Sequence, residues 1–186
     1  MPDLSQVQPF DDDQDDAGAA AAGLVNAIIE TPKGSRNKFT YQPVCGLFKL
    51  DGVLPAGAVY PFDYGMIPGT LGDDGDPLDV LVLMDAPAFT GCWVPARLIG
   101  AIVAEQTERD GRTERNDRLV AVAAKSRDLE DVRELSDLSK SLLRELEHFF
   151  VSFNQVKGKT FRVRGRRGAA AARRLVRAGA RRRAKH

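Results

Sequence analysis

The chain has 186 residues, of which 27 are Lys or Arg and 26 are Asp or Glu, and 43% of its side chains are apolar. This length and composition predict one globular domain with a substantial core. They also exclude a membrane span of ~20 apolar residues. No basic segment followed by an apolar one is found at the N-terminus, so we expect a soluble cytoplasmic protein. The two cysteines, Cys45 and Cys92, lack metal-ligand spacing and are expected to be reduced and structural.

The first part of the chain is predicted to form an arm followed by short strands. Residues 1 to about 22 are acidic and then Ala/Gly-rich, with no apolar period, so a flexible arm is expected. Extended segments are then predicted over Leu24 to Ile29, Lys38 to Tyr41, Gly46 to Lys49 and Ala58 to Phe62. Short strands separated by Gly and Pro are typical of a small β-barrel.

An acidic turn that runs into an apolar strand follows. Its four carboxylates are those of Asp73, Asp74, Asp76 and Asp79. Crowded carboxylates either take up protons or share cations, and hard oxygen ligands favour Mg²⁺, Mn²⁺ or Ca²⁺. Turn chemistry at Asp74-Gly75 and the strand Val80 to Met84 bring three of the acids toward one pocket. A lone Asp-Gly pair is usually a solvated turn, but the additional acids favour a metal site. An EF-hand is excluded because its sixth position requires Gly, and here it is Asp79.

The second half of the chain changes from a β pattern to a helical one. Apolar residues from Leu135 to Phe153 recur at three- and four-residue steps, which predicts a helix starting near Ser136 or Asp137. His148 lies on or beside this stripe and is expected to be packed rather than to bind a ligand. The other predicted elements are a long strand over Trp93 to Glu105, a charged hairpin loop over Thr107 to Asn116, strands over Asp117 to Ala123 and Thr160 to Arg164, and an Ala/Arg-rich helix over Gly168 to Arg183.

The catalytic chemistry is narrowed by the residue types that are scarce. There are only two histidines, one of them terminal, so Ser-His-Asp, Cys-His and zinc devices are not supported. The Gly-rich phosphate-binding loops of nucleotide enzymes are absent as well. Carboxylates with bound divalent cations remain, and such cations can lower the pKa of water to ~7, which suits hydrolysis of a phosphoanhydride. The side chains available to hold phosphate oxygens are Lys33, Lys38, Lys49 and Arg118.

The sequence resembles the soluble family I inorganic pyrophosphatases at Glu30, Lys38, Tyr60 to Gly65 and above all Asp74 to Val80. The D-G-D-P-x-D core is a specific motif, and the similarity runs in order from about residue 25 to residue 164. The resemblance implies an α+β, mainly β fold, with an OB-like small barrel and flanking helices over residues 23–165. It also implies Mg²⁺-dependent hydrolysis of diphosphate to two phosphates, with Mn²⁺ as an alternative metal, by a homo-oligomer.

The resemblance further implies a role for each matching residue. Asp76 would orient or deprotonate the attacking water. The implied metal ligands are Asp74, Asp79, Glu30, Asp110 and Asp117. The implied phosphate-binding residues are Lys38, Tyr64 and Arg118, the last standing where the family usually has Lys.

Five positions depart from the family pattern: Thr40, Gly52, Asn116, Phe153 and Asn154. Each lost charged contact to phosphate or metal is expected to cost on the order of 1.5–3 kcal/mol. A weak or inactive relative therefore stays open, acting as a binding module for polyanions through the Arg-rich residues 166–186. Little aromatic interleaving in this segment argues against nucleic acid. Another phosphoanhydride substrate is the third hypothesis.

Overall fold

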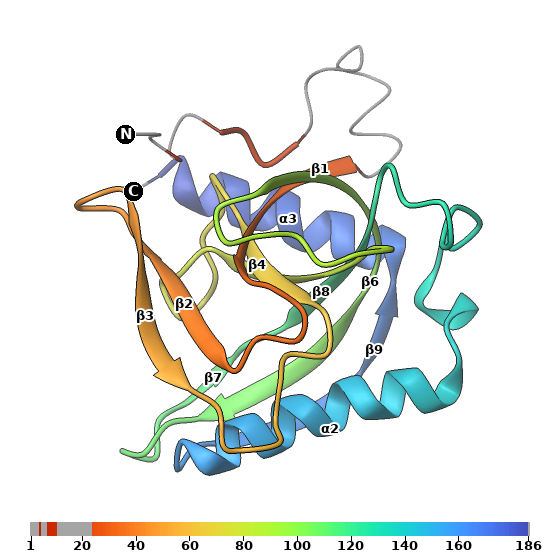
Figure 1. Ribbon diagram of the computed structural model, residues 1–186. Coiled ribbons are helices and arrows are strands. Elements are labelled where there is room, and N and C mark those ends of the chain that lie inside the picture. The colour runs from red at the N-terminus through yellow and green to blue at the C-terminus, as the bar shows by residue number, and fades with distance from the viewer. Residues whose placement is uncertain (1–3, 5–6, 11–23, 186) are drawn as a thin grey trace.

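The computed structural model describes residues 4, 7–10 and 24–185, and strands make up most of its regular structure (Figure 1). Its strands are β1 (Leu24–Thr31), β2 (Asn37–Gln42), β3 (Leu47–Val53), β4 (Asp63–Ile67), β5 (Leu78–Leu83), β6 (Trp93–Thr107), β7 (Thr113–Arg115), β8 (Arg118–Ala123) and β9 (Thr160–Gly168). Its helical segments are the 3₁₀ turn η2 (Leu135–Asp137), α2 (Lys140–Val156) and α3 (Ala169–Arg183). The mainly β architecture with helices is therefore confirmed.

The strand pairings form a ring. The main sheet runs β1-β4-β5-β8-β6-β7, and a further pairing between β1 and β6 closes the strands from β1 to β6 in this order into a ring. The strand β9 also joins β6, and β2–β3 forms a separate hairpin. The strand β8 is buried at every position, and it pairs in parallel with β5 and antiparallel with β6. Strands buried on both faces are read in sequence as continuous apolar runs, as in Leu119 to Ala123. The ring is consistent with the OB-like barrel that the resemblance implies.

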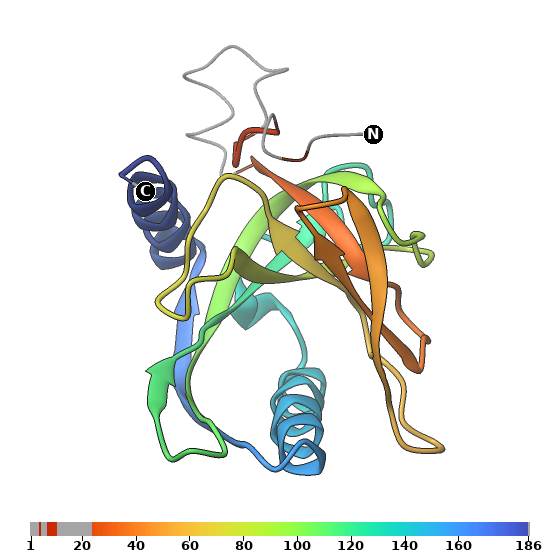
Figure 2. The ribbon, with the colours of Figure 1, turned by 90° about the vertical axis from the view of Figure 1, so that its left-hand side faces the viewer.

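Two apolar clusters use the alternation of side chains along these strands. Leu81 and Val120 point into a cluster completed by Leu146 and Phe150 of α2. Their neighbours along the strands point into a second cluster, which Ala172 and Val176 of α3 complete. Figures 1 and 2 show the two helices on opposite sides of the strands. The C-terminal helix is thus packed against the core rather than extending from it.

The predicted element boundaries hold at some ends and fail at others. The helix expected over Gly168 to Arg183 is confirmed, with Gly168 as its N-cap. The start expected near Ser136 or Asp137 is wrong, because Asp137 closes the 3₁₀ turn through the backbone N–H of Glu134 and Ser139 caps α2. A strand over Ala58 to Phe62 is also wrong, since the strand begins at Asp63.

The N-terminal segment is described only in part. Residues 7–10 contact β1: Phe10 forms a bridge with Val25, and the Asn26 side chain donates hydrogen bonds to the carbonyls of Gln8 and Phe10. Apart from Leu4, the remainder of the flexible arm expected over residues 1 to about 22 lies outside the described residues. Within the described residues, no helix combines the length and hydropathy needed to cross a membrane.

Candidate functional site

The four crowded aspartates lie on the loop between β4 and β5 and at the start of β5. We call residues 68–77 the acid loop. Gly75 has φ +86° and forms the turn, and the Asp76 N–H donates to the Asp74 carboxylate at 3.1 Å. At the loop ends, the Thr70 hydroxyl donates to the Ile67 carbonyl at 2.6 Å and accepts from the Leu78 N–H at 3.0 Å. Turn chemistry therefore fixes the spacing of the expected metal ligands.

Glu30 faces this loop because β1 contains a bulge. The β1–β4 register shifts between Ile29 and Thr31, which pair with Gly65 and Tyr64, so Glu30 is the extra residue. At Gly65 a Cβ would lie only 2.0 Å from the Ile28 carbonyl oxygen, so the close strand approach requires glycine. The Glu30 carboxylate is buried and accepts a hydrogen bond from the Tyr41 N–H at 2.7 Å. The bulge thus directs a buried acid into the site.

Burial and charge repulsion raise the pKa of three of the acids. Desolvation raises the pKa of Glu30 to about 7, and repulsion from Asp79 and Asp76 adds to the increase. Desolvation, followed by repulsion from Asp79, also raises the pKa values of Asp74 and Asp76. These carboxylates come from β1 and the acid loop, and each of them senses the charge of Asp79 at the start of β5. The site therefore holds more negative charge than its surroundings stabilise.

Arg118 on β8 partly neutralises this charge. Its guanidinium is buried, forms an ion pair with Asp79 and donates a hydrogen bond to the side-chain carbonyl of Asn116. The rings of Phe150 and Phe161 lie below it, with centroids 5.3 and 5.4 Å away. Asn116 in turn donates toward the Gln106 side chain at 3.4 Å. Arg118 thus links Asp79 to the amide of Asn116.

Two tyrosines adjoin the same charges. Tyr64 on β4 is buried and hydrogen-bonds to Asp79, and desolvation first and the Asp79 charge second raise its pKa well above the ordinary value. The Tyr60 hydroxyl is buried without a partner within the described residues, and burial likewise raises its pKa. Both phenols therefore stay protonated and can donate. Tyr60 carries no site role in the sequence prediction, although it begins the matching Tyr60 to Gly65 segment.

The expected phosphate ligand Lys38 lies on β2. Its ammonium forms an ion pair with Asp51 of β3 at 2.8 Å. It also stabilises the charged forms of Glu30 and Asp76 at longer range. Lys38 therefore lies near the acids, but its ammonium is already paired with Asp51, which is not among the predicted site residues.

Two expected metal ligands, Asp110 and Asp117, already have partners within the chain. Asp110 lies at the exposed tip of the β6–β7 hairpin, where its carboxylate accepts from the Arg112 N–H at 3.0 Å. Asp117 accepts from the Ala104 N–H at 3.2 Å and pairs with Arg115 at 2.7 Å. Asp117 nevertheless lines the same pocket as Asp74 and Asp79, and Asn116 is linked to Asp79 through Arg118. The acids that share the site are Glu30 and the three from the acid loop and β5.

The donor set fits a hard divalent cation. Carboxylate oxygens are the ligands that Mg²⁺ and Mn²⁺ prefer. The raised pKa of Glu30 and the unpartnered Tyr60 hydroxyl show that the polar groups here lack positive charge and hydrogen-bond donors or acceptors. In the described part of the chain, no three Asp, Glu, His or Cys side chains are arranged so that together they could hold a metal ion. The fit therefore rests on the chemistry of the donors.

The raised pKa of Glu30 predicts a pH-dependent stability in the metal-free protein. Its pKa is about 7 when folded and near 4.5 otherwise, so the folded state binds the proton more tightly. The contribution of protonated Glu30 to the free energy of unfolding is fully present below pH 4.5 and is lost as the pH rises through 7. We expect wild type to lose up to about 3 kcal/mol of unfolding free energy relative to Glu30→Gln between pH 5 and 8.

Urea unfolding in EDTA at pH 5, 6.5 and 8 measures this difference. The Gln side chain keeps an oxygen for the Tyr41 N–H, so the variant isolates the charge. If the unfolding free energies of wild type and Glu30→Gln differ by the same amount at every pH, the expectation is wrong.

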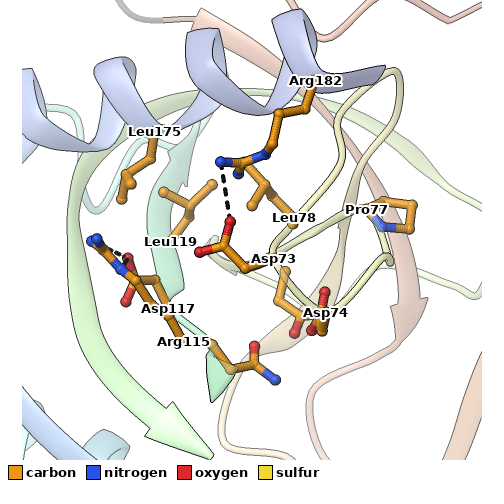
Figure 3. Close-up of a pocket in the computed structure, with 12 residues that line it drawn as sticks. Asp73, Asp74, Pro77, Leu78, Arg115, Asp117, Leu119, Leu175 and Arg182 are labelled. Carbon is orange, nitrogen blue, oxygen red and sulfur yellow. Dashed lines mark hydrogen bonds and ion pairs between the residues drawn. The ribbon is translucent and has the colours of Figure 1, made fainter. Parts of the chain in front are cut away.

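A pocket of about 70 Å³ lies on the α3 side of the acid loop (Figure 3). There Arg182 pairs with Asp73 at 3.1 Å and donates to the Leu71 carbonyl at 2.8 Å. The Leu71 N–H donates to the Gly179 carbonyl at 3.1 Å. Figure 3 also shows Arg115 and Asp117 paired at the opposite wall. The helix α3 therefore anchors the loop that presents Asp74 and Asp76.

The Arg-rich C-terminal segment is partly engaged by acids of the core. Arg166 forms two hydrogen bonds with Glu147, at 2.7 and 2.9 Å, and Arg182 pairs with Asp73. The buried side of α3 packs against the second apolar cluster. The polyanion-binding hypothesis stays a prediction.

Comparison with known proteins gives a consistent result. A family model described as inorganic pyrophosphatase matches residues 27–184. The inorganic pyrophosphatase of Thermus thermophilus is 39% identical over 164 residues, which cover 87% of this chain and 91% of the relative. That of Synechocystis is 40% identical over 144 residues, covering 77% and 82%.

Solved structures agree with these sequence matches. The crystal structure of the Thermus thermophilus inorganic pyrophosphatase superposes with a TM-score of 0.84 at 34% identity, covering 98% of this chain and 99% of that one. An inorganic pyrophosphatase from Neisseria gonorrhoeae gives a TM-score of 0.85 at 31% identity, with the same coverage of both chains. The matched region includes both the β elements that carry the acids and the helix α3.

Proposed function

Since the chain belongs to the inorganic pyrophosphatase family, we propose that its site hydrolyses inorganic diphosphate to two phosphates with Mg²⁺, or alternatively Mn²⁺, as cofactor. One observation carries the proposal: four carboxylates from β1, the acid loop and β5 are electrostatically coupled around a site that also holds two cations. Acids at this density favour hard cations, and Lys38 and Arg118 suit an anionic substrate.

The acids divide into metal ligands and a base. Asp74, Asp79 and Glu30 are the proposed metal ligands. Bound divalent cations would supply a water of lowered pKa and would neutralise the substrate charge. Asp76 accepts the proton of the attacking water on its carboxylate oxygen, since it lies on the loop beside the ligands and its raised pKa favours proton uptake. The new P–O bond forms as the bridging P–O bond of diphosphate breaks.

The remaining polar groups hold the phosphoryl oxygens. Lys38 on β2 and Arg118 on β8 come from different sheets and supply positive charge near the acids. Tyr64 keeps Asp79 oriented through its hydrogen bond. Asp110 and Asp117 stay predicted metal ligands, although their carboxylates are bonded within the β6–β8 region and only Asp117 lines the pocket of Asp74 and Asp79. The homo-oligomeric state stays a prediction.

Phosphate release from diphosphate, tripolyphosphate and ATP tests the proposal. We expect release with Mg²⁺ and Mn²⁺, none after metal removal with EDTA, and a kcat/KM for diphosphate at least tenfold above that for either longer substrate. We expect this preference because only a few cationic side chains lie near the acids. They are too few to bind the additional phosphate groups of tripolyphosphate or ATP.

Two results would contradict parts of the proposal. A preference for tripolyphosphate or ATP would favour the same metal chemistry on another phosphoanhydride. Background release from all three substrates by a folded protein would favour the inactive binding module instead. Binding of an anionic polymer, titrated with salt, then becomes the relevant measurement.

A further inference from the structure

The C-terminal end of α2 places a second lysine beside Lys38. Lys157 is the C-cap of α2, and its N–H donates to the carbonyls of Asn154 and Gln155. Its own carbonyl accepts from the Arg109 side chain at 2.8 Å. The Lys157 ammonium lies over the Phe153 ring, 4.4 Å from the centroid. The backbone is therefore held from two sides, and the aromatic ring orients the side chain.

Lys157 and Lys38 line the same cavity. This cavity of about 70 Å³ lies between the β2–β3 hairpin and the end of α2, with Gly52, Leu54 and Phe153 among its lining residues. Gly52 leaves open space, because a Cβ built there meets nothing within 4 Å. Two ammonium groups from different elements thus border one opening that a small anion can enter.

The charges around this cavity do not balance. Asp51 pairs with Lys38 at 2.8 Å, whereas no ion pair of Lys157 is found within the described residues. Burial and then repulsion from Lys38 lower the pKa of Lys157 to about 8. A half-buried ammonium beside another ammonium is stabilised by an anion that contacts both. The cavity therefore carries a surplus of positive charge.

The cavity adjoins the acids through Lys38, which is coupled to both Glu30 and Asp76. Positive charge is absent at two nearby positions where the resemblance calls for it. Gly52 has no side chain, and Asn154 is buried with its amide donating to the Phe150 carbonyl at 2.9 Å. Neither residue can hold a phosphate, so Lys157 is the cation that the end of α2 does offer.

We propose that Lys157 is a substrate-binding residue that, together with Lys38, holds the phosphoryl group of diphosphate farther from the acid loop. This inference rests on the proposed function, because it takes diphosphate as the substrate. It goes beyond the family's pattern in assigning the phosphate contact to a residue three positions after Asn154. The side chain arrives from the helix C-cap instead of the last helical turn.

The test compares Lys157→Met with Lys157→Arg and with a matched control, Lys159→Met. Lys159 lies two residues further on and is held by Glu108 at 2.7 Å. We expect Lys157→Met to raise the KM for diphosphate about tenfold, with kcat changed less than threefold. We expect Lys157→Arg to restore most of the affinity and Lys159→Met to leave KM within twofold. Circular dichroism and urea unfolding establish that each variant is folded.

Calorimetric binding of methylenediphosphonate, which cannot be hydrolysed at its bridge, separates this inference from the proposed function. We expect the Kd to rise about tenfold in Lys157→Met, whether or not the wild type turns over diphosphate. If the wild type hydrolyses diphosphate while KM and Kd are unchanged in folded Lys157→Met, the inference is overturned and the proposed function stands. If Kd rises without wild-type hydrolysis, the function fails and the anion site stands.

Discussion

Replacing Asp76 by Asn is expected to lower kcat for diphosphate about 1000-fold while the protein stays folded. The amide has the same shape but cannot accept the proton of the attacking water, and general bases typically contribute 10²–10⁴-fold. Asp76 is exposed on the acid loop, and the hydrogen bond that its N–H donates to Asp74 is a backbone one. The loss should therefore appear in kcat, measured by phosphate release at saturating diphosphate and Mg²⁺.

Asp73→Asn is the matched control for this experiment. Asp73 lies on the same loop and is also exposed, but its carboxylate pairs with Arg182 on the α3 side. An exposed pair of this kind contributes about 0–1 kcal/mol, so kcat should stay within a few-fold of wild type. Equal losses in the two variants would show that any charge change on the loop impairs the enzyme, and the role of Asp76 as base would be rejected.

Replacing Arg118 by Met is expected to lower the unfolding free energy of the metal-free protein by about 3 kcal/mol, more than the surface substitution Arg166→Met. The guanidinium is buried, and it stabilises Asp79 and holds the side-chain carbonyl of Asn116. Removing it leaves the Asp79 carboxylate near other acids without its cation. Met preserves the apolar contact with Phe150, so the variant mainly removes charge. Urea unfolding in EDTA measures the effect.

A double-mutant cycle isolates the ion pair. Because Asp79→Asn removes the unpaired charge, Arg118→Met should cost at least 1 kcal/mol less in that background than in wild type. The surface control is Arg166→Met, whose pairing with Glu147 is partly exposed and should contribute at most about 1 kcal/mol. Equal losses at positions 118 and 166 would contradict the account of a charge-balancing arginine.

Local chemistry explains which parts of the site the sequence predicted. The turn at Asp74-Gly75 and the apolar strand after it depend on neighbouring residues, so their geometry follows from the sequence. The Ala/Arg-rich segment after Gly168 likewise predicted the helix α3, but not its packing against the second apolar cluster. By contrast, Ser136, Asp137 and Ser139 are all good N-caps. Tertiary packing selects Ser139 by burying Leu138 in the first cluster.

Long-range contacts explain what the sequence left out. The bulge at Glu30 arises from pairing with β4, which no local pattern of β1 reveals. The short strand β4 is buried at every position and lacks the polar alternation that marks a strand. The side-chain directions of Asn116 and Asp117 depend on where β8 begins, so a one-residue change in register exchanges them. The approach of Lys157 to Lys38 joins the end of α2 to β2 and has no sequence signature.

We propose that the acids of β1, the acid loop and β5 support metal-dependent hydrolysis of diphosphate although Gly52 and Asn154 offer no charged side chain for phosphate. The most direct measurement is the initial rate of phosphate release from diphosphate by metal-stripped protein, titrated with Mg²⁺. We expect phosphate release to be absent without metal, to rise to saturation with Mg²⁺ and to be lost in Asp76→Asn. Release at the uncatalysed rate at every Mg²⁺ concentration, from protein shown to be folded by circular dichroism, would contradict it.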